Sequence, residues 1–132
     1  MSVVGRWMRF NAVGVVGMGV QLGSLAVLSR WLGGHTQMAT AAALEVTLIH
    51  NFVWHRRFTW REREVGRGGM WGQLMRFHLS NGVISLVGNV ALMWVLAGHL
   101  GVLVANGVAI VCCSVVNFFL GERWAFALGR GV

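Results

Sequence analysis

One pattern occurs twice in this chain, at a nearly constant offset. The first copy has Arg9-Phe10, an apolar stretch, and then the motif Asn-Phe-x-x-x-x-Arg-aromatic-x-aromatic at 51–60. The second copy has Arg76-Phe77, another apolar stretch, and the same motif at 117–126. The two Arg-Phe pairs lie 67 residues apart and the two longer motifs lie 66 apart. Self-similarity at a fixed offset indicates one structural unit that is used twice.

The composition indicates where such units can fold. The chain has 132 residues, of which 56% are hydrophobic and only 11% are charged. A soluble domain carries about 25% charged residues, so this chain has too little polar surface to coat a globule. Each repeat contains two apolar segments, and crossing about 30 Å of hydrocarbon takes about 20 helical residues. We therefore predict membrane-spanning helices at about 9–31, 36–55, 75–97 and 101–121.

These spans predict an all-α membrane protein with four transmembrane helices, arranged as two helical hairpins related as parallel repeats. We expect one transmembrane domain over 1–132, with repeat one at about 6–60 and repeat two at about 73–127. The short, Gly-rich connections at 32–35 and 98–101 suit tight hairpins. The middle connection, 56–74, is richer in charge and glycine, and we expect it to be polar, flexible and exposed.

Arginine predicts the orientation of the spans. The net charge of +7 comes from eleven arginines and no lysine. Ten of them flank the two termini and the middle connection, and only Arg30 lies at the other end of the first span. Positive residues stay on the cytoplasmic side, so we expect a multi-pass protein of the cytoplasmic (inner) membrane with both termini inside. Since the charges sit between apolar runs and not on a solvated face, we expect no nucleic-acid partner.

Polar residues inside apolar spans mark where helices meet or where a polar substrate passes. Glu45 is the most informative of them, because an isolated carboxylate within lipid costs several kcal/mol unless it is paired or protonated. We interpret six residues as a candidate substrate path: Glu45, Asn51, Asn117, Gln21, Asn81 and Asn89. The alternative is that they only pack and hydrogen-bond between helices.

The arginines at the cytoplasmic helix ends are candidates for binding phosphate, because a guanidinium can hold phosphate through two parallel hydrogen bonds. Arg57 and Arg123 are the strongest candidates, since each follows the motif asparagine by six residues. Arg56, Arg9 and Arg76 complete the candidate set. The alternative is that these cations stabilise helix C-termini and fix the orientation.

Catalytic and metal-binding patterns are not evident. The five histidines show no ligand spacing, and Cys112 and Cys113 are adjacent inside an apolar run. There is no glycine-rich phosphate loop, no Ser/His/Asp set and no pair of carboxylates. We therefore expect no metal, no cofactor and no enzymatic activity.

The duplicated set of motifs, in this order from about residue 6 to 127, resembles the GtrA-like family. That resemblance implies a small four-span membrane protein linked to cell-surface polysaccharide synthesis and O-antigen modification. Such proteins are proposed to act as a flippase for a polyprenyl-phosphate-linked sugar, and similar domains occur fused to polyprenol-phosphate-mannose-type synthases. The chain departs from the pattern at Asn81, where the first copy has Gly14, and at Gln21, near where relatives often carry an acid.

Three functions follow as hypotheses. The first is translocation of a polyprenyl-phosphate-linked sugar. The second is a non-transporting membrane anchor that recruits a polyprenyl-phosphate glycosyltransferase. The third is a small multidrug-type cation exporter that uses Glu45, which the arginine bias disfavours because many such exporters insert in both orientations. Four short helices enclose little volume, so besides membrane lipid we expect a homo-oligomer or a membrane glycosyltransferase as partner.

Overall fold

A computed structural model describes residues 1–63 and 68–128, apart from the side chains of Val102 and Leu103. Of the arginines in the orientation argument, Arg67 and Arg130 lie outside the described residues. Within the described ranges all regular structure is helical, so the prediction of an all-α membrane protein is confirmed. The chain divides into two compact units, unit 1 at Met1–Glu62 and unit 2 at Arg63–Val132.

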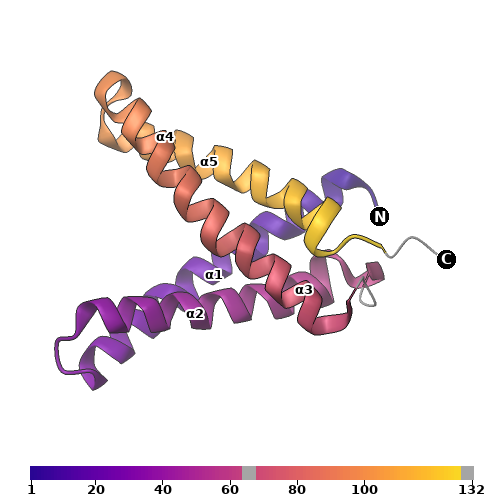
Figure 1. Ribbon diagram of the computed structural model, residues 1–132, viewed down its shortest axis with the longest axis horizontal. Helices are drawn as coiled ribbons and strands as arrows, with labels where there is room; N and C mark the ends of the chain where they lie inside the picture. The colour runs from indigo at the N-terminus through magenta and orange to yellow at the C-terminus, as the bar shows by residue number, and fades with distance from the viewer. Residues whose placement is uncertain (64–67, 129–132) are drawn as a thin grey trace. The chain divides into compact units, whose positions relative to one another are not determined.

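Unit 1 is a pair of helices that lie side by side (Figure 1). Helix α1 (Val3–Trp31) begins where the Ser2 hydroxyl accepts a hydrogen bond from the amide of Gly5, at 3.1 Å. The turn that follows uses Gly33 and Gly34, whose φ angles of 56° and 93° are unfavourable for other residues. The chain then returns as α2 (Thr36–Trp54), which continues into a π-helical turn, η1 (His55–Thr59).

Unit 2 is also built around two long helical segments. The 3₁₀ turn η2 (Arg61–Arg63) leads toward it, and α3 (Gly69–Phe77), the π-helical η3 (His78–Ile84) and α4 (Ser85–Leu100) follow one another as a single helical run.

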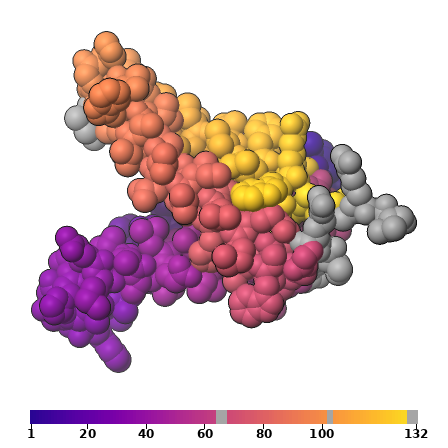
Figure 2. Space-filling view, in the orientation of Figure 1, coloured from indigo at the N-terminus to yellow at the C-terminus, as the bar shows by residue number. Residues whose placement is uncertain are grey.

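A turn at Gly101, where φ is 76°, reverses the chain into α5 (Val102–Leu120) and the π-helical η4 (Gly121–Ala125). Side chains of α4 and α5 are in contact along the face of unit 2 visible in Figure 2.

Small residues allow the helices to approach closely. Ala39 and Ala43 of α2 and Ala105 and Ala109 of α5 are at most 1% exposed. In unit 1, a Cβ added at Gly17 would lie only 2.8 Å from an amide nitrogen of Asn51. Such close contacts between backbones are typical of helices that pack within a membrane.

Three helical segments are long and apolar enough to cross a membrane: Val3–Trp31, Gly69–Leu100 and Val104–Ala125. The predicted span at 36–55 is helical, as α2, but it is not among these three in the described part of the chain. Gln37, Glu45, His50 and Asn51 lower its hydropathy. Four helical segments are therefore present, while length and composition support membrane crossing for three of them.

The middle connection is helical where we predicted a flexible loop, although more than half of its described residues are exposed as predicted. Helical structure covers 55–59, 61–63 and 69–77, so most of the described connection is ordered. Thr59, Trp60 and Gln73 are fully buried. The reason is local: the π-helical turn η1 widens the end of α2 and directs Trp60 back onto α1. Residues 64–67 of the predicted loop lie outside the described residues.

Candidate functional site

Each unit has an arginine that caps the end of its second helix. In unit 1, Nη1 of Arg9 donates to the carbonyl oxygen of Phe58 at 3.0 Å. In unit 2, Nε of Arg76 donates to the carbonyl oxygen of Trp124 at 3.1 Å. Carbonyl groups at a helix C-terminus lack partners within the helix and favour a nearby cation. Both arginines were predicted to bind phosphate, and the structure gives each of them a capping contact as well.

Aromatic packing accompanies these caps. In unit 1, Phe10 stacks on His55 with ring centres 4.7 Å apart, and its ring lies edge-to-face with Trp60 at 6.0 Å. In unit 2, Phe77 lies edge-to-face with Phe126 at 6.1 Å. The second aromatic residue of each motif, Trp60 or Phe126, is fully buried. The Arg-Phe pairs and the aromatic-x-aromatic segments thus meet within each unit, which explains why they recur together.

Arg57 and Arg123 are in a different situation from Arg9 and Arg76. Both are exposed, and each lies in a π-helical turn that follows a long helix. Within the described residues neither guanidinium makes a hydrogen bond or an ion pair, although that of Arg123 lies over the Phe119 ring at 5.6 Å. Arg56, their neighbour in the candidate set, is half-buried. Arg57 and Arg123 are therefore well placed to bind an anion.

The two motif asparagines lie where the long helices of each unit meet. Asn51 faces Gly17, and its Oδ1 is 3.1 Å from Nδ1 of His50. Asn117 donates through Nδ2 to the hydroxyl of Ser85 at 3.1 Å. Its Oδ1 is buried and has no hydrogen-bond partner among the described residues. Asn117 and Ser85 also line a groove of about 300 Å³ between α4 and α5.

The other candidate path residues differ in their exposure within each unit. Glu45 lies on the exposed face of α2, whereas its neighbours Ala43 and Thr47 are buried. Gln21, Asn81 and Asn89 are half-buried, and Asn81 donates to the Ser80 hydroxyl at 3.3 Å. The place of Glu45 on a substrate path therefore stays a prediction. Its use by a cation exporter stays a prediction.

Two glutamates that form ion pairs near the unit boundary were not predicted. Glu62 accepts from Nη1 of Arg6 at 3.0 Å within unit 1. Arg63, the next residue, holds Glu122 within unit 2, with Nη2 at 2.7 Å from the carboxylate and Nη1 at 2.7 Å from the carbonyl oxygen. The fully buried Gln73 donates to the carbonyl oxygen of Arg63 at 3.2 Å. Sequence spacing gives no signal for pairs so distant along the chain.

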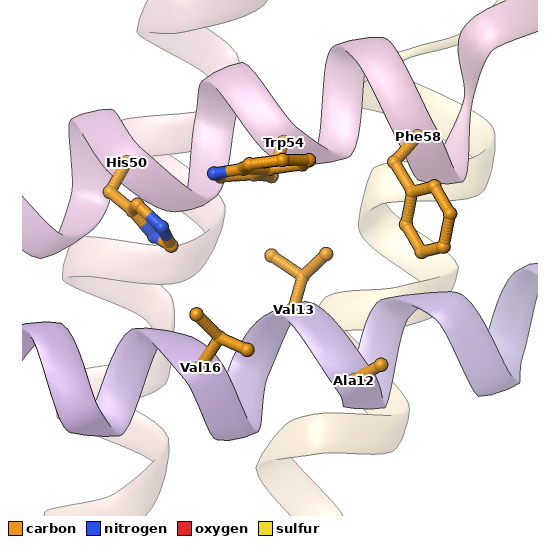
Figure 3. Close-up of a pocket in the computed structure, with 6 residues that line it drawn as sticks. All are labelled: Ala12, Val13, Val16, His50, Trp54 and Phe58. Atoms are coloured by element: carbon orange, nitrogen blue, oxygen red, sulfur yellow. The ribbon is translucent and has the colours of Figure 1, made fainter.

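A groove in unit 1 was also missed. It has a volume of about 180 Å³ and is lined by Ala12, Val13 and Val16 of α1 and by His50, Trp54 and Phe58 from α2 and η1. Figure 3 shows the three rings along one side of the groove, opposite the small side chains of α1. His50, Trp54 and Phe58 follow one another at intervals of four residues, and this spacing could have predicted that their rings lie in a row on one helix face. The walls are apolar, so the groove suits a hydrocarbon group.

A wide, open depression, named the polar cavity for the charged residues that line it, lies close to this groove. It has a volume of about 340 Å³ and is lined by Met1, Arg9, Arg61 and Glu62. Arg9 connects the two, because its guanidinium lies 4.6 Å from the centre of the Phe58 ring, at the end of the groove.

Within the described residues, no group of three or more His, Cys, Asp or Glu side chains could hold a metal ion.

Comparison with known proteins agrees with these features. The sequence matches the family described as GtrA/DPMS, transmembrane domain, over residues 9–126. The chain is also similar to a dolichol-phosphate mannosyltransferase of Pyrococcus furiosus, at 29% identity over 126 residues. That alignment covers 94% of this chain and 34% of the relative, so the chain spans about a third of the relative's length. With three apolar helices long enough to cross a membrane and a match over most of its length, this membrane protein belongs to the GtrA/DPMS transmembrane domain family.

Proposed function

We propose that this chain translocates a polyprenyl-phosphate-linked sugar across the cytoplasmic membrane, for polysaccharide or O-antigen modification. The family and its mannosyltransferase relative support the substrate class. The observation that carries the proposal is the pair Arg57 and Arg123, exposed and without an intrachain ion pair among the described residues. A guanidinium can hold a phosphate through two parallel hydrogen bonds, and each unit supplies one of these arginines.

The proposal includes an arrangement of the chain in the membrane. Both termini face the cytoplasm, and α2 crosses the membrane together with the three more apolar segments. Each unit then forms one helical hairpin of a duplicated structure. The matching caps on Phe58 and Trp124, and the matching π-helical turns η1 and η4, support the duplication. The protein works as a homo-oligomer, because one copy offers little interior volume for a sugar.

Translocation in liposomes tests this function. Liposomes that contain only this protein should move a labelled polyprenyl-phosphate sugar between leaflets. The double variant Arg57→Ala, Arg123→Ala should abolish movement while its thermal unfolding in detergent changes little. Within the described residues the Arg57 guanidinium makes no hydrogen bond or ion pair, and that of Arg123 makes only an exposed contact with the Phe119 ring. Arg30→Ala, at the other end of the first span, is the matched control and should transport normally. Full transport by the double variant would contradict the proposed role.

A second function is favoured by the alignment with the mannosyltransferase. This chain matches one part of that longer protein, a dolichol-phosphate mannosyltransferase. A membrane domain of this kind can act as an anchor that holds a separate glycosyltransferase at the membrane without moving lipid. The anchor function predicts that a glycosyltransferase co-purifies with the chain and that purified liposomes show no translocation. The chain itself is proposed to catalyse no reaction in either case.

A further inference from the structure

The apolar groove and the polar cavity of unit 1 adjoin at Arg9. The groove is lined by the rings of His50, Trp54 and Phe58, and Arg9 lies over the Phe58 ring. On its other side Arg9 lines the polar cavity together with Arg61. One hydrogen bond from Arg9 goes to the carbonyl oxygen of Phe58, and a guanidinium has five N–H groups. Arg9 therefore retains donors for a ligand while it caps the helix.

The charge of the polar cavity favours an anion. Arg9 and Arg61 contribute two positive charges, and Arg61 is exposed. Glu62 also lines the cavity, but its carboxylate is paired with the buried Arg6 at 3.0 Å. The net field at the end of the groove is thus positive. Two guanidinium groups suit a phosphate, which accepts two parallel hydrogen bonds from each.

We propose that unit 1 is a binding site for one lipid phosphate, with its hydrocarbon chain in the groove and its phosphate between Arg9 and Arg61. The identity of that lipid as a polyprenyl phosphate rests on the proposed function, whereas the site itself requires no transport. The ligand is a lipid and not a free phosphate, because the positive cavity adjoins a groove that only hydrocarbon would fill.

The site is specific to unit 1. Trp124 of unit 2 is equivalent to Phe58 of unit 1, 66 residues earlier. At the same offset, unit 2 has Ala127 and Leu128 where unit 1 has Arg61 and Glu62. Unit 2 therefore has the capping arginine, Arg76, but no second cation at this position. The two units therefore differ at this place: unit 1 holds the lipid phosphate between Arg9 and Arg61, and unit 2 keeps only the capping arginine.

Binding of a short-chain polyprenyl phosphate to the purified full-length chain in detergent tests the site, measured by native mass spectrometry. Arg61→Ala should weaken binding by about tenfold or more, as expected for loss of a charge-assisted hydrogen bond. Val16→Trp should weaken it similarly by filling the groove. Val15→Trp is the matched control, because Val15 is 63% exposed on the same helix and does not line the groove. Unchanged affinity in both Arg61→Ala and Val16→Trp would overturn the site.

Three further probes separate the ligand classes. The polyprenyl phosphate should bind at least about tenfold more tightly than inorganic phosphate or the uncharged polyprenol, since each probe supplies only one half of the ligand. Equal binding of inorganic phosphate would overturn the role of the groove. Equal binding of a two-chain phospholipid phosphate would indicate adsorption of bulk lipid and would also overturn the proposal.

The outcomes for the site and for transport are distinguishable. If Arg57→Ala, Arg123→Ala abolishes translocation while Arg61→Ala and Val16→Trp leave binding intact, transport stands and this site is wrong. If Arg61→Ala and Val16→Trp lose binding while wild-type liposomes move nothing, the site stands and the transport function is wrong. Arg9→Ala is not used here, because it would also remove the cap on Phe58.

Discussion

Arg9 donates a hydrogen bond to the carbonyl oxygen of Phe58 at 3.0 Å, and its guanidinium carbon lies 4.6 Å from the centre of the Phe58 ring. One side chain thus links the start of α1 to the end of the second helix in unit 1. Arg76 and Trp124 are joined in the same way in unit 2, at 3.1 Å. The repeated motifs therefore serve first of all to hold each pair of helices together at one end.

Removing a capping arginine should loosen the unit that contains it. Arg76→Ala leaves the carbonyl oxygens of Trp124 and Ala125 without their donor. A hydrogen bond to a charged group contributes about 1.5–3 kcal/mol, and partial exposure of these atoms argues for the lower end. We expect the melting temperature in detergent to fall, while Arg30→Ala leaves it unchanged. Equal melting temperatures for the two variants would show that the cap contributes nothing.

The contact between Gly17 and Asn51 should tolerate no side chain at Gly17. A Cβ there would lie 2.8 Å from Nδ2 of Asn51, so Gly17→Ala must displace the amide from His50. Overpacking costs typically about 1–3 kcal/mol. At Gly14 an added Cβ meets nothing within 4 Å, so Gly14→Ala is the matched control and should be neutral or slightly stabilising.

Thermal unfolding of both variants measures the difference between Gly17 and Gly14. Adding Asn51→Ala to Gly17→Ala should recover part of the loss, because the clashing amide is then absent. A loss that does not change in the double variant would mean that the strain arises elsewhere.

The buried tryptophan of unit 1 should matter far more to stability than the exposed one nearby. Trp60 is fully buried against Phe10 and His55, and truncating a buried aromatic side chain costs about 3–5 kcal/mol. Trp60→Ala should therefore impair folding, and the fluorescence emission maximum of the remaining tryptophans should move to longer wavelength. Trp54 is 51% exposed and lines the groove, so Trp54→Ala should fold normally. Similar unfolding of the two variants would contradict this assignment.

The two glutamates that pair with arginine should differ in their contribution to stability. The Arg63 and Glu122 side chains are 14% and 12% exposed, and they are 2.7 Å apart. Breaking a buried pair leaves an uncompensated charge and costs about 3–5 kcal/mol, so Glu122→Gln should be strongly destabilising. The Glu62 side chain is 46% exposed, and the buried Arg6 also donates to the carbonyl oxygen of Met1 at 2.7 Å. Glu62→Gln should therefore cost less than Glu122→Gln, about 1 kcal/mol.

Chemical denaturation in detergent micelles compares Glu122→Gln with Glu62→Gln. Added salt should reduce the effect of Glu62→Gln more than that of Glu122→Gln, since exposed charges are screened more strongly. Equal losses would indicate that burial does not govern these pairs.

Much of the fold was predictable from sequence, because the local composition of a membrane helix identifies it. The positions of α1, α4 and α5 and the glycine turns at 33–34 and 101 follow from apolar length and from residues that accept positive φ. The predicted loop at 56–74 was wrong for most of its described part. A π-helical turn has no distinct composition, so nothing in the sequence indicated that the chain would fold Trp60 back onto Phe10.

The candidate site was predicted less completely. The sequence singled out the repeated arginines, but it could not separate Arg9 and Arg76, which bond to backbone carbonyl groups, from the exposed Arg57 and Arg123. It identified Glu45 by its cost in lipid, but not the face of α2 on which Glu45 lies. Arg61 was not among the predicted phosphate-binding residues, because only the tertiary structure places it in one cavity with Arg9.

The sequence by itself determined that this protein is helical, that it belongs in a membrane and that two parts of the chain share one set of motifs. Those properties depend on hydropathy, length and spacing, which are local or simply repeated. Only the tertiary structure decided which carbonyl oxygen each arginine meets, which tryptophan is buried, and that an apolar groove ends beside two cations in unit 1. These depend on how α1 aligns with α2 and α4 with α5, and that alignment arises from packing between residues far apart in the chain.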